Sequence, residues 1–287
     1  MTTETTDDAR RAMSEIAEAI APTWERRRAE IEEICAPVRA WMVRELAPRP
    51  GDTVLELAAG PGDTGFEAAA HVGERGRLIT SDLASGMLAA ARRRGAELGV
   101  RNVEYRLIDA ERIELEAGSV DGVLCRFAYM LMPNPPAALA GTCRVLRPGG
   151  RLAHAVWGAP ERNPFFATIA GALVRRGQIP PPEPPPAPGV FSMASAERTT
   201  ALLEQAGFGA VRCEEVAVRF TVRDAEGYLD LVADTAGPIG LAVRALSPGD
   251  HAMVRDEMAV ACEPFAGDDG LEIPGVALCA AAARTAN

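Results

Sequence analysis

Lysine is absent from this sequence of 287 residues, in which arginine supplies all 30 basic side chains. Without lysine there is no side-chain amine to form a Schiff base, to act as an amine base or to contact phosphate. The 40 acidic residues outnumber the basic ones and give a net charge of −10. Because a phosphate-binding surface is normally basic, this balance argues against nucleic acid as the main partner.

Cysteine and histidine are few and scattered. The six cysteines and three histidines show neither C-x-x-C spacing nor a cluster that suits a metal. We therefore expect no metal, and reduced, mostly buried thiols in a cytoplasmic protein. The first residues are acidic and rich in threonine, and no uncharged apolar run reaches 18 residues, so we expect no membrane span. Homodimerisation is left open.

A glycine-rich turn follows the apolar residues Val54 to Ala59 and leads into a helical segment that begins near Gly65. This order predicts a strand, a tight loop and a helix N-terminus, where glycine lets the backbone approach a ligand and free N–H groups face it. Gly60, Gly62 and Gly65 match G-x-G-x-x-G, which alone only weakly indicates a dinucleotide-like ligand. Glu56 is unusual, because a buried strand rarely carries a lone acid and a pyrophosphate would be repelled by it. The segment therefore favours a cationic ligand.

Strand-like and helical segments alternate through the first half of the chain. The expected strands cover residues 54–59, 77–82, 103–108, 119–126 and 151–157, with helices over 65–72, 85–98 and 136–145 between them. Together with two later strands, this alternation predicts an α/β fold, a doubly wound Rossmann-like sheet of seven mostly parallel strands. Ligands of such sheets bind beyond the carboxyl ends of the strands. We therefore expect Glu56 to Gly62, Asp82, Asp109 and Cys125-Arg126 to converge on one crevice.

These residues resemble the class I S-adenosylmethionine-dependent methyltransferases, specifically the small-molecule group that includes quinone-biosynthesis-like enzymes. The likeness is strongest over residues 50–157. Val54 to Gly62 is similar to the family's glycine loop, with Ala58 where many members have the first glycine. Arg144-Val145-Leu146-Arg147-Pro148-Gly149-Gly150 is similar to the family's turn between the fourth helix and the fifth strand, and this heptad is its most specific part.

The resemblance implies S-adenosyl-L-methionine as the cofactor and gives roles to the residues at the strand ends. Asp82 stands where the family binds the ribose, and Asp109-Ala110 where an acid and its neighbour flank the adenine. The loop backbone suits the methionine portion, and Glu56 serves the ammonium directly or through loop backbone or water. The residues expected to bind the cofactor are Glu56, Ala58, Gly60, Gly62, Asp82, Leu83, Met87, Asp109, Ala110 and Arg126.

One methyltransferase domain is expected over residues 1–287, with residues 50–160 as its cofactor-binding core. Residues 1–10 are expected to be disordered, and residues 12–47 to form a helical lid broken at Pro22 and Pro37. Segments 161–190 and 224–267 are expected to cap the substrate. They contain an expected helix over 161–178, a proline-rich linker over 179–188 and helices within 224–265; a helix over 195–205 and strands over 211–222 and 276–283 complete the chain.

Methyl transfer requires the protein to align donor and acceptor, to exclude water and, for a neutral hydroxyl acceptor, to remove a proton. No residue is strongly marked as a catalyst. The candidates are Tyr129, His154 and His251, each of which also has an ordinary structural interpretation. Arg126 could bind either ligand, and Trp24 could cover the cofactor as part of the lid.

The expected function is methyl transfer to O, N or C of a small, aromatic or lipophilic metabolite, because the segments outside the core are rich in apolar residues. One alternative is a protein that binds S-adenosylmethionine without transferring methyl. Another, an NAD(P)-dependent oxidoreductase, is disfavoured by Glu56 and Asp109 and by the lack of a Tyr-x-x-x-Lys pair. A protein or nucleic-acid methyltransferase is a further alternative, of which amino-directed DNA methylation is disfavoured because residues 126–129 read Arg-Phe-Ala-Tyr rather than Asn-Pro-Pro-Tyr.

Overall fold

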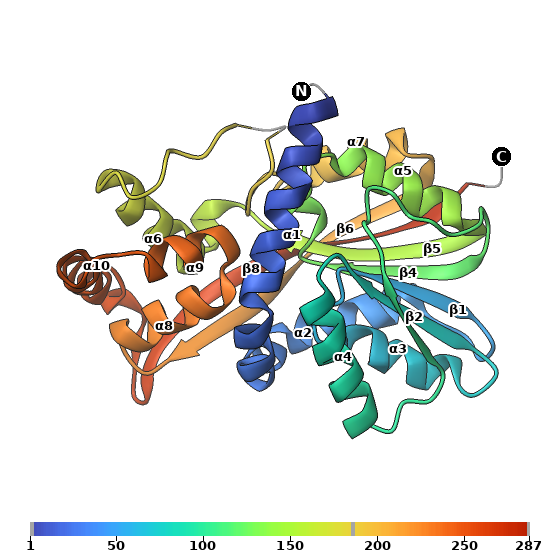
Figure 1. Cartoon of the computed structure of the whole chain (residues 1–287), viewed down its shortest axis with the longest axis horizontal. Helices are drawn as coiled ribbons and strands as arrows, with labels where there is room; N and C mark the ends of the chain where they lie inside the picture. Colours follow the sequence, from blue (N-terminus) through green and yellow to red (C-terminus); the bar gives the residue numbers. More distant parts are fainter. Residues whose placement is uncertain (1–2, 185–186, 286–287) are drawn as a thin grey trace.

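A computed structural model describes residues 3–184 and 187–285 of the chain. Its centre is an eight-stranded sheet of order β3-β2-β1-β4-β5-β8-β6, with the short β7 paired to β8 (Figure 1). The strands are β1 (Thr53–Leu57), β2 (Arg77–Asp82), β3 (Val103–Leu107), β4 (Val120–Arg126), β5 (Leu146–Trp157), β6 (Phe208–Val222), β7 (Ala266–Gly267) and β8 (Gly270–Arg284).

The first five strands are parallel, and the strand order reverses between β1 and β4. This arrangement confirms the expected doubly wound α/β fold, and it places a ligand crevice beyond the carboxyl ends of β1 and β4. The expected count of seven strands was wrong by one, because the two-residue β7 pairs with β8 at its start. The turn expected over residues 146–150 lies inside β5, where the pairing with β4 shifts register.

Helices cover both faces of the sheet. They are α1 (Thr3–Arg26), α2 (Arg28–Leu46), α3 (Asp63–Val72), α4 (Ser85–Glu97), α5 (Pro135–Val145), α6 (Pro164–Arg175), α7 (Ala196–Gln205), α8 (Ala225–Thr235), α9 (Gly237–Arg244) and α10 (Pro248–Ala261), with short 3-10 turns at Tyr129–Leu131, Pro160–Arg162 and Glu263–Phe265. Helices α2, α3 and α4 pack in sequence along one face, whereas α5 packs on β5, and α7 on β6 and β8. Among the described residues, no helix has the length and hydropathy that crossing a bilayer requires.

The N-terminal region corrects two expectations. Residues from Thr3 onward are helical rather than disordered, and Arg10 anchors this part through an ion pair with the distant, buried Glu111. Residues 1 and 2 lie outside the described part. Pro22 and Pro37 lie inside α1 and α2, and the break falls at Arg27 instead. An internal proline costs a helix about 3 kcal/mol, and here buried residues beside each proline, such as Ala21 and Val38, offset that loss by packing.

The last two long strands form a ribbon that projects past the sheet. Strand β5 pairs with β8 only as far as Trp157 and Ala277, whereas β6 and β8 continue pairing to Val222 and Leu271. Helices α8, α9 and α10 are inserted between these strands and gather with α6 at one end of the molecule (Figure 1). The helices expected over residues 161–178, 195–205 and 224–265 are confirmed, and the described part of the linker over 179–188 contains no helix or strand after the end of α6. Residues 185 and 186 lie outside the described part.

Candidate functional site

A cavity lies beyond the carboxyl ends of β1, β2 and β4, bounded by α1 and by residues of α6, α8 and α9. Nine of the ten residues expected to bind the cofactor line it, namely Glu56, Ala58, Gly60, Asp82, Leu83, Met87, Asp109, Ala110 and Arg126. Gly62 instead forms the N-cap of α3 at a φ of 88°, and an added Cβ there would lie 2.8 Å from the ring of Phe66. The strand ends therefore converge as the sequence predicts, except that Cys125 is fully buried and does not line the cavity.

Glu56 is 3% exposed and supports the glycine loop from below. Its Oε1 accepts a 2.7 Å hydrogen bond from the backbone amide of Gly65, and its Oε2 accepts a 2.8 Å bond from the hydroxyl of Thr80. Burial raises the pKa of Glu56 to about 8, although these two donors and the charge of Arg126 act in the opposite direction. Its carboxyl thus joins β1, β2 and the start of α3 at the floor of the cavity.

Asp82 ties the glycine loop to the end of β2. Its Oδ2 accepts a 2.9 Å hydrogen bond from the amide of Gly60, and its Oδ1 accepts a 3.0 Å bond from the amide of Ala84. Burial raises the pKa of this carboxyl, against the stabilising effect of the amides. Because a carboxylate oxygen has two lone pairs, each oxygen can accept a further bond from a ligand in the cavity.

A second acidic group follows β3. Oδ1 of Asp109 accepts a 2.9 Å hydrogen bond from the amide of Glu111, and Arg10 of α1 lies 3.7 Å from Oδ2 of Asp109. Arg10 also forms an ion pair with Glu111. Sequence reasoning missed Arg10 and Glu111, and only the helical spacing of Arg10 with the apolar residues of α1 indicates that it faces inward.

Helix α1 covers the cavity with one face. Its lining residues recur at helical spacing, and they are Arg10, Met13, Ile16, Ala17, Ile20 and Trp24. On one side, Glu18 accepts bonds from the amides of Ser85 and Gly86 at the start of α4. On the other side, the indole N–H of Trp24 donates to the carbonyl of Thr235, at 3.2 Å, on α8. Helix α1 therefore bridges the core and the cap.

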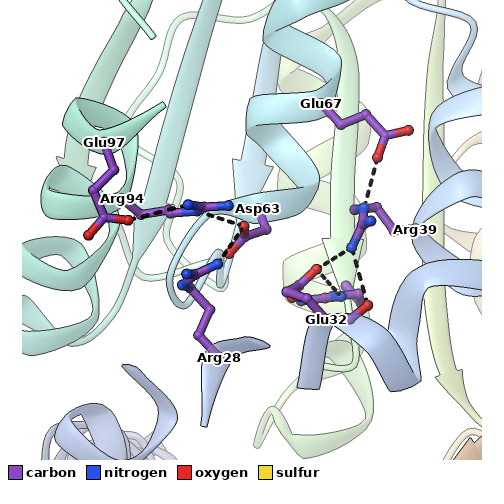
Figure 2. Close-up of polar contacts among 8 residues, drawn as sticks. Arg28, Glu32, Arg39, Asp63, Glu67, Arg94 and Glu97 are labelled. Carbon is purple, nitrogen blue, oxygen red and sulfur yellow. Dashed lines mark hydrogen bonds and ion pairs between the residues drawn. The ribbon is translucent and has the colours of Figure 1, made fainter. Parts of the chain in front are cut away.

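Arg126 ends β4, which lies between β1 and β5 in the sheet. Its terminal nitrogens donate to Glu32 of α2 at 2.5 and 3.3 Å, and Glu32 also accepts a 2.5 Å bond from Arg39. Arg39 reaches Glu67 in turn at 2.8 Å, as Figure 2 shows. Burial disfavours the charge of Arg126, but Glu32, Cys35 and Glu56 together outweigh it and raise the pKa of the guanidinium. The Arg126–Glu32 pair is thus ionised at neutral pH.

Another charged cluster holds the start of α3. Asp63 accepts bonds from Arg94 of α4 at 3.0 Å and from Arg28 of α2 at 3.4 Å, and Arg94 reaches Glu97 at 3.3 Å (Figure 2). An acid in the first turn also complements the helix dipole. Because none of these four residues lines the cavity, we give this cluster a structural role only.

Aromatic rings form the wall on the cap side. Phe127 stacks on Trp157 with ring centroids 4.1 Å apart, and Phe166 and Phe220 lie 4.9 and 5.7 Å from Trp157. All four residues line the cavity. Phe127 has a φ of 57°, a left-handed conformation that bulky residues rarely adopt and that tends to occur at functional sites. The cap side of the cavity is therefore apolar and aromatic.

The three catalytic candidates do not line this cavity. Tyr129 is fully buried and bonds to the hydroxyl of Thr142 at 2.8 Å. His154 is also fully buried, neither ring nitrogen has a partner among the described residues, and burial lowers its pKa to about 4. His251 lies on α10, 3.9 Å from Glu226. We assign none of them a step in the reaction.

Residues 54–150 match the family model of a methyltransferase domain. Over 101 residues the chain is 31% identical to the methyltransferase tpcH of Aspergillus fumigatus, covering 34% of this chain and 36% of that protein. It is 36% identical over 118 residues to the ubiquinone/menaquinone biosynthesis C-methyltransferase UbiE of Francisella tularensis, covering 40% and 47%. The nocamycin O-methyltransferase of Saccharothrix syringae is 32% identical over 120 residues, covering 42% and 43%. The chain thus spans less than half the length of these relatives.

Solved structures share the fold. The YcgJ protein from Bacillus subtilis superposes with a TM-score of 0.58 at 19% identity, covering 87% of this chain and 98% of that one. A phosphoethanolamine methyltransferase of Haemonchus contortus, solved with S-adenosylhomocysteine, gives 0.54 at 18% identity, covering 86% and 52%. The [4+2]-cyclase SpnF gives 0.54 at 17% identity, covering 86% and 80%.

Sequence match and fold define the class of the domain. Residues 54–150 are a methyltransferase domain of the class I, S-adenosylmethionine-dependent type, built on a Rossmann-like sheet. The resemblance drawn from the glycine loop and from the turn over residues 144–150 is confirmed at this level.

Proposed function

We propose that this protein transfers the methyl group of S-adenosylmethionine to a small aromatic or lipophilic molecule. The main support for this proposal is the cavity. It is lined by acidic and backbone groups at the ends of β1 and β2 and by stacked aromatic rings toward α6 and α8. A cofactor with a polar adenosine and an acceptor with an apolar body suit these two halves.

The residues at the strand ends fit the cofactor. Asp82 and Asp109 stand at the ends of adjacent strands, where two carboxylates suit sugar hydroxyls and an adenine amine. Leu83, Met87 and Ile108 add apolar surface beside them for a flat base. Glu56 acts through the glycine loop, because it is buried beneath that loop and accepts the amide of Gly65.

The chain's own contribution to the reaction is alignment and exclusion of water. When bound, S-adenosylmethionine supplies a methyl carbon that its sulfonium already activates. The protein needs to hold the acceptor in line with that carbon, and a well-placed pair of reactants accounts for much of such a rate enhancement. We propose that α1, with Trp24 above Gly60, acts as the lid, and that α6, α8 and α9 cap the acceptor.

Calorimetric titration with S-adenosylmethionine, S-adenosylhomocysteine and NADH tests this function. We expect the two adenosyl ligands to bind and NADH not to bind. Asp82→Ala should weaken the adenosyl ligands by at least about tenfold, or about 1.4 kcal/mol. Asp256→Ala is the matched control, because its carboxylate is 72% exposed on α10. Binding of NADH alone would overturn the proposal.

A second assay separates binding from turnover. Transfer of radiolabelled methyl is measured over a panel of aromatic and aliphatic acceptors that includes phenols, carboxylic acids and amines. Methylation of any of them supports the proposal. Adenosyl binding without methylation of any panel member would favour a cofactor-binding protein that catalyses no methyl transfer; the likeness to a protein named a [4+2]-cyclase is the observation that keeps this second candidate.

A further inference from the structure

Arg126 places a guanidinium in the lining of the cavity, directly before Phe127 of the aromatic wall. The same cavity is lined by the apolar residues Phe127, Ala128, Met130, Trp157, Phe166 and Phe220. The other lining arginine, Arg10, lies beside Asp109 and Glu111 on the opposite side. A buried cation is costly, so its retention at the end of β4 calls for a partner or a task.

Glu32, the ion-pair partner of Arg126, does not fully neutralise the positive charge around it. Glu32 is shared between Arg126 and Arg39, so these three groups together carry a charge of +1. The next acid on Arg39, Glu67, has a 38% exposed side chain and is screened by solvent. Glu56 also interacts with Arg126, but its raised pKa keeps it largely protonated near neutral pH in the free protein.

The hydrogen-bonding groups of Arg126 are also only partly used. Within the part of the chain that the structure describes, its bonds run from the two terminal nitrogens to Glu32. Its Nε–H is therefore a donor without a protein acceptor, on a side chain that lines the cavity and is 10% exposed. The thiol of Cys35, which lines the same region, is not a competing anion, because burial raises its pKa to about 11.

We propose that Arg126 holds an anionic oxygen of the acceptor, so that the acceptor is an apolar molecule carrying one ionised hydroxyl or carboxylate. This inference rests on the proposed methyltransferase function and names its substrate class. The shared chemistry is one oxyanion on an apolar body: the guanidinium takes the charge, and the aromatic wall takes the body.

An acceptor that binds as its anion needs no protein base, and no histidine or tyrosine is among the described residues that line the cavity. An oxygen acceptor that enters as its anion has already lost its proton to solvent. Its own lone pair forms the new bond to the methyl carbon, and the electron pair of the broken carbon–sulfur bond stays on sulfur. No proton has to be removed inside the cavity, and the positions of Tyr129, His154 and His251 away from it are consistent with this.

The first experiment uses the wild-type protein saturated with S-adenosylhomocysteine, with 4-nitrophenol as the probe. The anion of this phenol absorbs visible light, so a titration followed by absorbance gives the pKa of the bound hydroxyl. The titratable groups that interact with Arg126 are Glu32, Cys35 and Glu56, and Arg39 shares Glu32 with it. We expect the bound pKa to lie about one unit or more below that of the free phenol, a tenfold preference for the anion. No binding, or no lowering, would overturn the proposal.

Two variants assign the effect to Arg126. Glu32→Gln with Arg126→Gln removes both members of the pair and avoids leaving a buried acid alone. We expect this variant to lose the pKa shift but to bind S-adenosylhomocysteine within about twofold of wild type. Arg94→Gln is the matched control, since Arg94 belongs to the separate cluster around Asp63 and does not line the cavity, and it should keep the shift. A double variant that keeps the shift, or that loses S-adenosylhomocysteine instead, would overturn the proposal in favour of a cofactor role.

The source of the oxyanion is decided by comparing probes. 4-Nitrobenzoate and the phenolate of 4-nitrophenol are titrated against wild type and the double variant, with nitrobenzene as the uncharged control. We expect at least one anion to bind about tenfold more tightly to wild type than to the variant, and nitrobenzene to show no difference. Whichever anion shows the larger effect identifies the acceptor as a phenol or a carboxylic acid. If S-adenosylhomocysteine does not bind the wild-type protein, the proposed methyltransferase function is wrong. If it binds but the anions show no preference for wild type, only the role of Arg126 is wrong.

Discussion

Oε1 of Glu56 accepts a 2.7 Å hydrogen bond from the backbone amide of Gly65. This bond joins the second half of β1 to the first turn of α3. It lies beneath the glycine loop, whose residues Ala58 and Gly60 line the cavity. Gly65 has room only for hydrogen, because an added Cβ would collide with the carboxylate of Glu56. The acid inside the strand and the glycine nine positions later are therefore two halves of one contact.

Glu56→Gln should stabilise the protein increasingly as the pH rises. Burial raises the folded-state pKa of Glu56 from 4.5 to about 8, so between these values the unfolded state releases a proton that the folded state keeps. Stability from this group is complete below about pH 4.5 and is lost as the pH approaches 8. Urea unfolding at about pH 5 and about pH 8 should show a gain for the variant, relative to wild type, on the order of 3 kcal/mol at the higher pH. An equal difference at both pH values would contradict the raised pKa.

Ala58→Gly should stabilise the protein by about 1 kcal/mol, because a left-handed backbone costs an L-residue roughly that amount. Ala58 has a φ of 50° at the end of β1. Ala59→Gly is the matched control: its backbone is not left-handed, so glycine there should destabilise by about the same amount through chain entropy. Both are measured by urea unfolding. A loss of stability in Ala58→Gly as large as that in the control would show that the backbone at Ala58 is not strained.

His154→Leu should make the protein more resistant to acid. Burial lowers the folded-state pKa of His154 from 6.5 to about 4, so the unfolded state binds a proton that the folded state excludes. Wild-type stability should therefore fall as the pH drops below about 6.5 and level off near pH 4, a loss on the order of 3 kcal/mol from this residue. The variant should lack this loss in acid unfolding followed by circular dichroism. His71→Gln, at an exposed position, should behave like wild type.

Asp234→Asn should loosen α1 without unfolding the core. Asp234 of α8 accepts bonds from Arg26 and Arg27 at 2.9 Å and from Arg244 at 3.1 Å, and so it joins the end of α1 to the cap. Losing the charge should speed amide exchange in residues 10–26 by about tenfold, because local opening costs less. Hydrogen exchange read by mass spectrometry measures this, with the exposed Asp230→Asn on the same helix as control. Unchanged exchange in α1 would show that Asp234 is not its tether.

The strands and helices of the core could be predicted from sequence, because the patterns that indicate them lie within short segments of the chain. The parallel strands are short segments rich in apolar residues, and the residues that follow them meet at one edge of the sheet. Thus Glu56, Asp82 and Asp109 could be placed near one another before any contact was known. The roles of these residues toward the cofactor stay predictions.

The way in which α1 covers the cavity could not be predicted, because its contacts join distant parts of the chain. Arg10 meets Glu111 across 101 positions, and Glu18 reaches Ser85 across 67. Local rules also placed the helix break at Pro22 and Pro37, whereas buried neighbours hold both prolines inside helices. The stacking of Phe127 on Trp157 depends on a left-handed residue after β4 and on the pairing of β4 with β5, neither of which a sequence pattern reveals.

The ribbon of β6 and β8 makes α8 to α10 an insertion within a hairpin, entered from one strand and left by its neighbour. Such an insertion can lengthen, shorten or be exchanged between relatives without altering the order of the parallel strands or the loops at their ends. Selection can therefore act on the two halves of the cavity separately, changing what the cap accommodates while leaving the other half intact. In an engineering setting, residues 223–269 form the natural unit to graft over the aromatic wall, because none of the four wall residues lies in this segment.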